Sequence, residues 1–174
     1  ALEALSTALA QHHAGHIPFT AKWKVGVLAP STELELLEQL LARLPGDGYL
    51  RLDANGGWDR ATAGRWAQRL QAEPRLQWLE QPLAASDHEG LVALSRRLPV
   101  ALDESLRDPA GAPPNWQGWR VHKPALEGDP RPLLQRLQAG AAKEMVSTVF
   151  ETGIGGRAIA HLAALAADGP SSCA

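Results

Sequence analysis

The sequence predicts an α/β protein, a partial β/α barrel in which about six of the eight strands of a closed barrel are present. From about residue 21 onward, short apolar segments alternate with longer segments whose apolar residues recur at helical spacing. Charged residues also stand at or just before the ends of five different predicted strands. A closed barrel gathers such residues at one mouth, whereas an open sheet spreads them along a line.

Six short segments are the predicted strands, and each is bounded by turn residues or by a helix cap. They are residues 21–27, 49–53, 76–80, 100–103, 119–123 and 144–148. Strands joined by helices through right-handed crossovers form a parallel sheet. Periodicity alone leaves both an open doubly wound sheet and a closed barrel possible, and the charged strand ends favour the barrel.

Helices are predicted between the strands. Thr32 and Glu35 predict a capping box, and Asp59 and Asp87 predict two further N-caps. Apolar stripes follow these caps: Leu36, Leu37, Leu40 and Leu41, then Ala63, Trp66, Ala67 and Leu70, then Leu91, Leu94 and Leu98. Residues 2–9 are amphipathic, and residues 129–138 and 156–167 complete the predicted helices.

The composition is that of an ordinary globular protein, with 174 residues, 45% hydrophobic and 21% charged. The net charge of −2 and the lack of a basic stretch favour neither nucleic-acid nor membrane partners, and they leave a small-molecule partner open. A single cysteine, Cys173, excludes an internal disulfide and favours a cytoplasmic location. The oligomeric state is left open. One catalytic domain is expected over residues 1–174.

Two lysines lie on one face of the first predicted strand. Side chains alternate along a strand, so Lys22 and Lys24 point one way and Trp23, Val25 and Val27 point the other. At a sheet edge, such lysines are ordinary solvated residues that discourage aggregation. Inside a barrel, mutual repulsion and burial would lower the lysine pKa and free a neutral amine to act as a base.

Three acidic residues, Asp53, Glu80 and Asp103, end three consecutive predicted strands. Each one alone could cap the following helix or turn, but three converging carboxylates repel one another unless a cation holds them. Oxygen ligands of this kind favour Mg²⁺ (or Mn²⁺) over zinc. Lys123 ends the next strand. A divalent metal flanked by lysines suits removal of a proton from the carbon beside a carboxylate.

Five motifs follow one another along the chain: Lys22-Trp23-Lys24, Asp53-Ala54-Asn55, Leu79-Glu80-Gln81-Pro82, Leu102-Asp103-Glu104-Ser105 and His122-Lys123-Pro124-Ala125. In this order they resemble the muconate-lactonizing subgroup of the enolase superfamily, which has a TIM-type barrel. Within the subgroup, residues 51–56, 101–106 and 150–155 are most similar to the o-succinylbenzoate synthase family. The resemblance implies a lyase that dehydrates 2-succinyl-6-hydroxy-2,4-cyclohexadiene-1-carboxylate in menaquinone or phylloquinone biosynthesis.

The resemblance also implies roles for individual residues. Asp53, Glu80 and Asp103 would be the Mg²⁺ ligands. Lys24 would be the base, Lys22 would lower the pKa of Lys24, and Lys123 would stabilise the anionic intermediate. The implied substrate-binding residues are Asn55, Ser147, Glu151, Gly153 and Gly155. The glycines could bind a carboxylate at a helix N-terminus or could form a plain turn.

Two alternatives remain open. A double-lysine site can also support racemisation, which allows an N-acylamino acid racemase or a dipeptide epimerase, although residues 147–153 lack the Asp-x-Asp motif typical of dipeptide epimerases. The other alternative is a truncated, non-catalytic relative. The family's N-terminal capping domain and two barrel strands are not recognised in the sequence, so we expect a barrel truncated at both ends and weak activity of this segment alone.

Overall fold

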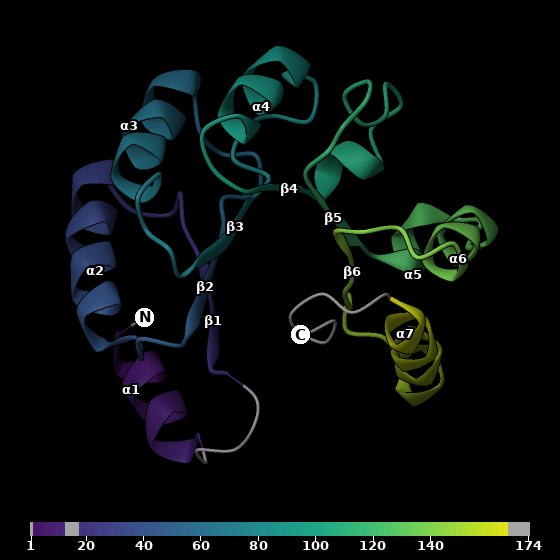
Figure 1. Ribbon diagram of the computed structural model, residues 1–174, viewed down its shortest axis with the longest axis horizontal. Coiled ribbons are helices and arrows are strands. Elements are labelled where there is room, and N and C mark those ends of the chain that lie inside the picture. Colours follow the sequence, from purple (N-terminus) through teal and green to yellow (C-terminus); the bar gives the residue numbers. More distant parts are fainter. Residues whose placement is uncertain (1, 13–17, 167–174) are drawn as a thin grey trace. The chain divides into compact units, whose positions relative to one another are not determined.

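The computed structural model of the protein describes residues 2–12 and 18–166, in which strands and helices alternate (Figure 1). Cys173 lies outside the described residues. The strands are β1 (Thr20–Lys24), β2 (Tyr49–Asp53), β3 (Leu76–Glu80), β4 (Val100–Leu102), β5 (Trp119–His122) and β6 (Glu144–Val146). They follow the chain order in one sheet, and their pairing is parallel. All six predicted strands are therefore confirmed.

All of the helices except α5 occupy predicted intervals. They are α1 (Leu2–Gln11), α2 (Pro30–Arg43), α3 (Arg60–Leu70), α4 (His88–Ser95), α5 (Pro124–Glu127), α6 (Arg131–Gln138) and α7 (Gly153–Leu165). A 3₁₀ turn at Glu104–Leu106 and the short α5 were not predicted, because a single helical turn leaves too few residues for a periodic pattern. Within the described residues, no helix is long and apolar enough to cross a membrane.

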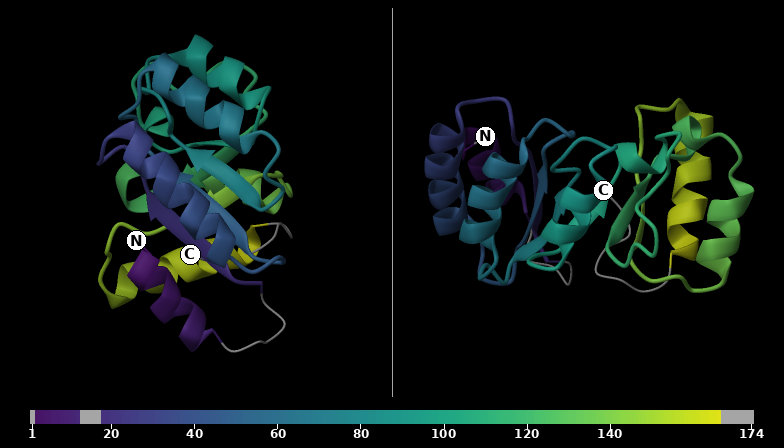
Figure 2. Two further views of the ribbon diagram at one scale, coloured as in Figure 1. Left: turned by 90° about the vertical axis from the view of Figure 1, so that its left-hand side faces the viewer. Right: turned by 90° about the horizontal axis from the view of Figure 1, so that it is seen from above.

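The chain divides into two compact units, Ala1–Val100 and Ala101–Ala174. In the first unit, α2 and α3 cover one face of β1, β2 and β3 (Figures 1 and 2). The Trp23 ring of β1 lies 6.2 Å from the Trp66 ring of α3, so Trp23 faces the helices. Leu50 and Leu52 of β2 are fully buried. Because side chains alternate, Lys22 and Lys24 occupy the opposite face of β1, as predicted.

The first strand is shorter at its C-terminal end than the alternating pattern predicts. β1 ends at Lys24, and Gly26 has a φ of +83°, a backbone conformation that turns the chain out of the sheet. Val27, predicted to continue the buried face, is 77% exposed. Val25 is still buried, so the apolar alternation continues for one residue beyond the hydrogen-bonded strand.

The predicted caps had different outcomes. Asp59 and Asp87 are confirmed as N-caps, because their side chains accept hydrogen bonds from the backbone N–H groups of Thr62 and Gly90. The capping box is wrong. α2 already begins at Pro30, and its N-cap residue makes no side-chain hydrogen bond, so Thr32 and Glu35 lie inside the helix. Proline favours the first helical position because it has no N–H to satisfy there.

In the second unit, α6 and α7 pack around an apolar cluster with β6. The cluster consists of Leu133, Leu137, Val146, Ile159 and Ala163. α7 begins three residues earlier than predicted, at Gly153, and the backbone N–H of Gly156 donates to the carbonyl oxygen of Thr152. Gly153, Gly155 and Gly156 thus lie in the first turn of the helix.

Candidate active site

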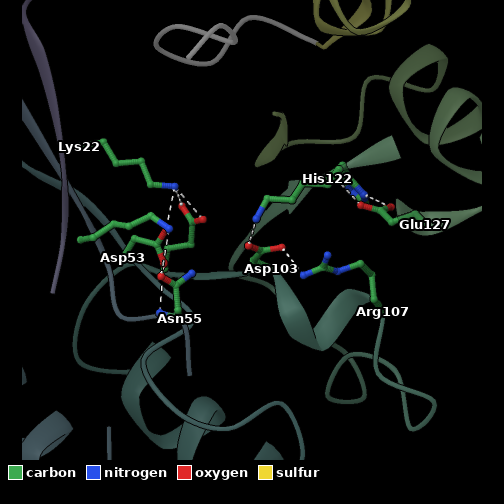
Figure 3. Close-up of polar contacts among 10 residues, drawn as sticks. Lys22, Asp53, Asn55, Asp103, Arg107, His122 and Glu127 are labelled. Atoms are coloured by element: carbon green, nitrogen blue, oxygen red, sulfur yellow. Dashed lines mark hydrogen bonds and ion pairs between the residues drawn. The ribbon is translucent and has the colours of Figure 1, made fainter. Parts of the chain in front are cut away.

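The ends of β1, β2 and β3 bring together the lysine–carboxylate cluster, formed by Lys22, Lys24, Asp53, Asn55 and Glu80 (Figure 3). The strand register places Lys24 beside Asp53 and Asp53 beside Glu80. Lys22 Nζ lies 2.9 Å from both Glu80 carboxylate oxygens and 3.0 Å from Asp53 Oδ2. Both carboxylates are only 1% exposed. One ammonium group therefore compensates two buried negative charges.

The pKa of Lys22 differs from the sequence-based expectation. Burial by itself would lower the pKa of this lysine, but the charges of Glu80 and Asp53 and its hydrogen bonds to them raise the pKa above the ordinary value. The expectation of a lowered pKa for the lysine pair is thus wrong for Lys22. Its close neighbours are carboxylates on the adjacent strands, which sequence alternation within β1 does not reveal.

Asn55 connects the second lysine to the first carboxylate. Lys24 Nζ donates a hydrogen bond of 3.3 Å to Asn55 Oδ1, and the Asn55 backbone N–H donates to Asp53 Oδ1 at 3.1 Å. Asn55 has a φ of +46°, a conformation that asparagine tolerates better than most residues. The tight turn after β2 therefore orients both Asp53 and the amide that contacts Lys24.

Two residues missed by sequence reasoning support Glu80. Trp78 Nε1 donates to Glu80 Oε2 at 3.3 Å, and the guanidinium of Arg51 lies 4.1 Å from the centre of the Trp78 ring. Burial lowers the pKa of Arg51 to about 10, although the Glu80 charge acts in the opposite direction. Arg51 and Trp78 stand two residues before Asp53 and Glu80. Strand alternation could have placed them on the same face.

In the second unit, Asp103 follows β4 and is 1% exposed. Its Oδ2 accepts a hydrogen bond from Lys123 Nζ, and its Oδ1 accepts one of 3.1 Å from Arg107 (Figure 3). Two cations thus surround one buried carboxylate. Arg107 was not predicted. It lies four residues after Asp103, and the unpredicted 3₁₀ turn between them brings its side chain back to the Asp103 carboxylate.

The chemistry of these groups fits a hard divalent cation. Asp53 and Glu80 already share one cation, the Lys22 ammonium, through three oxygen atoms, and Asp103 is a third buried carboxylate. Oxygen donors of this kind suit Mg²⁺ or Mn²⁺. Within the part of the chain that the structure describes, no three His, Cys, Asp or Glu residues form a group that could hold a metal ion. The three-carboxylate metal site stays a prediction.

The predicted substrate-binding residues of the second unit lie after β6 and at the start of α7. The Ser147 backbone N–H donates to the His122 carbonyl oxygen, and Glu151 Oε2 accepts from the Val149 backbone N–H. The Glu151 Oε1 atom is buried without a hydrogen-bond partner. Glu151 and Gly155 also line a cavity of about 780 Å³ whose walls come largely from α7, with smaller contributions from α5 and α6.

Comparison of the sequence with models of known protein families identifies the family of the chain. The family model described as "Enolase C-terminal domain-like" matches residues 5–117. The chain belongs to this enolase family. Its similarity extends to o-succinylbenzoate synthase of Thermosynechococcus vestitus, which is 40% identical over 153 residues, covering 82% of this chain and 48% of the relative. The chain thus spans about half the length of the curated relatives it matches.

Solved structures agree with the enolase-family assignment. A magnesium complex of o-succinylbenzoate synthase from Thermosynechococcus elongatus BP-1 aligns with a TM-score of 0.78 and 32% identity, over 99% of this chain and 56% of that one. Muconate cycloisomerase from Pseudomonas fluorescens aligns with a TM-score of 0.73 and 26% identity, over 98% of this chain and 48% of that one. The predicted fold class, a partial β/α barrel of the enolase superfamily, is confirmed.

Proposed function

We propose that this chain carries the catalytic β/α portion of an o-succinylbenzoate synthase. The observation that carries the proposal is the 40% identity to such a synthase over 82% of the chain. The lysine–carboxylate cluster supports it, because it combines an amine that could accept a proton with buried oxygen ligands at neighbouring strand ends. The proposed substrate is 2-succinyl-6-hydroxy-2,4-cyclohexadiene-1-carboxylate.

In this proposal Lys24 is the base. Its neutral amine takes the proton from the carbon beside the substrate carboxylate, and Asn55 holds the amine through the 3.3 Å hydrogen bond. The same ammonium then gives the proton to the departing hydroxyl group. The carbon–hydrogen and carbon–oxygen bonds break on the same side, a double bond completes the aromatic ring, and water leaves.

Asp53, Glu80 and Asp103 are the proposed ligands of Mg²⁺ or Mn²⁺. A bound divalent cation would stabilise the negative charge that develops on the substrate carboxylate. Lys22 keeps Asp53 and Glu80 oriented through its three oxygen contacts. Lys123, which contacts Asp103, would supply a further positive charge for the anionic intermediate.

The remaining parts of the proposal concern binding and location. Asn55, Ser147, Glu151, Gly153 and Gly155 are the proposed substrate-binding residues. Of these, Glu151 has a buried oxygen free of hydrogen bonds, which a donor group on a ligand could satisfy. A place in menaquinone or phylloquinone biosynthesis and a cytoplasmic location follow from the same assignment.

The test uses the full-length protein. Conversion of the cyclohexadiene substrate should require Mg²⁺ or Mn²⁺, cease with a chelator, and fall about 10²- to 10⁴-fold in Lys24→Ala. Lys143→Asn is the matched control, because Lys143 is exposed and its φ of +62° suits asparagine. Full activity of Lys24→Ala would rule out the mechanism. Exchange of a substrate α-hydrogen with solvent deuterium, without dehydration, would instead indicate a racemase or epimerase.

A further inference from the structure

A second group of buried charges surrounds His122, the last residue of β5 (Figure 3). Its Nδ1 lies 2.7 Å from Glu127 Oε2, and its Nε2 lies 2.6 Å from Glu144 Oε2. His122 is 6% exposed and Glu144 is 5% exposed. None of the roles proposed above uses His122, Glu127 or Glu144.

The positions of the two carboxylates favour a protonated imidazole. A neutral histidine has one N–H donor, so one of its ring nitrogens would direct a lone pair at a carboxylate oxygen. Burial lowers the pKa of His122, but the hydrogen bonds and charges of Glu127 and Glu144 outweigh burial and raise it above 6.5. Arg120 and Arg136 also contact Glu144, and these five residues form the His122 cluster.

The cluster is connected to Lys123 through the backbone. Glu127 uses one oxygen for His122 and the other, Oε1, to accept a hydrogen bond of 2.6 Å from the Lys123 backbone N–H. Lys123 is the N-cap residue of α5, and Pro124 is the first residue of that helix. Glu127, the last residue of this single-turn helix, therefore reaches back to the residue before the helix.

The two carboxylates that contact His122 come from different elements, Glu127 from α5 and Glu144 from β6. Glu144 belongs to β6, whose residues pair with β5 in register, and Arg136 of α6 holds the other Glu144 oxygen. His122 thus joins a carboxylate on a paired strand to the carboxylate that holds the Lys123 N–H. Without the imidazolium, Glu127 and Glu144 would lose the positive charge between them, and Glu127 could turn away from the Lys123 backbone.

We propose that His122 is a positioning residue for Lys123. The protonated imidazole clamps Glu127 to Glu144, and Glu127 in turn fixes the backbone at which β5 becomes α5. This sets the direction from which the Lys123 side chain leaves the strand end and reaches Asp103. The proposal rests on the proposed function in that Lys123 is there assigned to stabilise the anionic intermediate.

A double-mutant cycle in the full-length protein tests the proposal. His122→Gln should lower kcat by about 10- to 100-fold with little change in KM, because supporting hydrogen bonds around active-site groups typically contribute that much. Glu127→Gln should also lower kcat, and the double variant should lose no more than the larger single loss, since both residues act through one connection. Losses that simply multiply would overturn the proposal.

Leu137→Ala separates positioning from general stability. Leu137 is buried in α6 of the same unit but belongs to the apolar cluster, so its truncation should lower the melting temperature without lowering kcat. His122→Gln should lower kcat at temperatures where both variants remain folded. A loss of kcat in Leu137→Ala equal to that in His122→Gln would show that His122 contributes stability alone.

Hydrogen exchange gives a readout that does not depend on the proposed reaction. The Lys123 amide should exchange at least about 10-fold faster in His122→Gln than in the wild type, relative to amides of α6, because its acceptor is no longer held in place. Unchanged exchange at Lys123 would overturn the proposal even if the enzyme is active. Faster exchange in a protein that does not turn over the substrate would uphold the positioning and reject the proposed function.

Discussion

At the scale of single residues, Glu33 ties the loop after β1 to the start of α2. Its carboxylate accepts hydrogen bonds of 2.8, 3.0 and 3.1 Å from the backbone N–H groups of Gly26, Val27 and Leu28, and Glu33 is 2% exposed. Glu33→Gln replaces one acceptor oxygen by a donor. We expect the free energy of unfolding to fall by about 1–3 kcal/mol, because backbone donors lose their acceptor.

Urea denaturation measures this loss, with Glu35→Gln as the control. Glu35 lies on the same helix but is exposed, so its substitution should change the free energy of unfolding by less than about 0.5 kcal/mol. Equal effects of the two substitutions would mean that the three hydrogen bonds contribute little. Because the loop directly follows Lys24, the same variant also shows whether loop order affects turnover.

Residue types at strand ends allowed part of the candidate site to be predicted. Lys22, Asp53 and Glu80 lie together because parallel strands in register bring their C-terminal ends side by side, and the sequence shows which residues stand there. Glu33 and Arg107 could not be found in this way. Their contacts depend on the conformation of a loop or a 3₁₀ turn, and no periodic pattern in the sequence predicts that conformation.

At the scale of elements, two glycines have opposite effects. Gly26, two residues beyond the end of β1, has a φ of +83°, and a Cβ there would lie 3.0 Å from Trp58 Nε1. Gly64 lies inside α3, where a Cβ would meet no atom within 4 Å. Gly26→Ala should lower the free energy of unfolding by about 1–2 kcal/mol or more. Gly64→Ala should raise it by about 0.5–1 kcal/mol, since alanine loses less backbone entropy in a helix.

Each glycine variant is the control for the other, because both add one methyl group to the first unit. Denaturation midpoints at a constant m-value measure the two changes. A destabilising Gly64→Ala would indicate that α3 lacks the open space described here. A neutral Gly26→Ala would indicate that the turn after β1 relaxes to a conformation that alanine tolerates.

The elements were predictable to the extent that local patterns control them. Buried stripes such as Ala63, Trp66 and Ala67 were recognised because one helix face contacts one sheet face. Element ends were less predictable. The apolar alternation continued past Lys24, but the backbone of Gly26 ended the strand, and Pro30 began α2 ahead of the apparent capping box. Backbone geometry determines the end of β1 and the start of α2, and the pattern of apolar residues carries no information about that geometry.

At the scale of the whole molecule, buried ion pairs make stability depend on pH. Hydrogen bonds from His122 and Arg136 hold the pKa of Glu144 below 4.5 despite its burial. The stability from Glu144 is therefore present above pH 4.5 and is lost as the pH falls through the lowered pKa. Other paired carboxylates, including Asp87 and Glu73, also have lowered pKa values and act in the same direction. Acid unfolding thus has several contributors.

The contribution of His122 to stability can be measured from the pH dependence of unfolding above pH 6.5. Its pKa in the folded protein is raised above 6.5, so its stabilising contribution is complete below pH 6.5 and is lost as the pH rises through the raised pKa. We expect the melting temperature to decline over this range in the wild type and to decline less in His122→Gln. His161→Gln, at an exposed position of α7, should retain the wild-type slope. Differential scanning calorimetry from about pH 5 to 9 measures these slopes, and an unchanged alkaline slope in His122→Gln would contradict a protonated His122 in the folded protein.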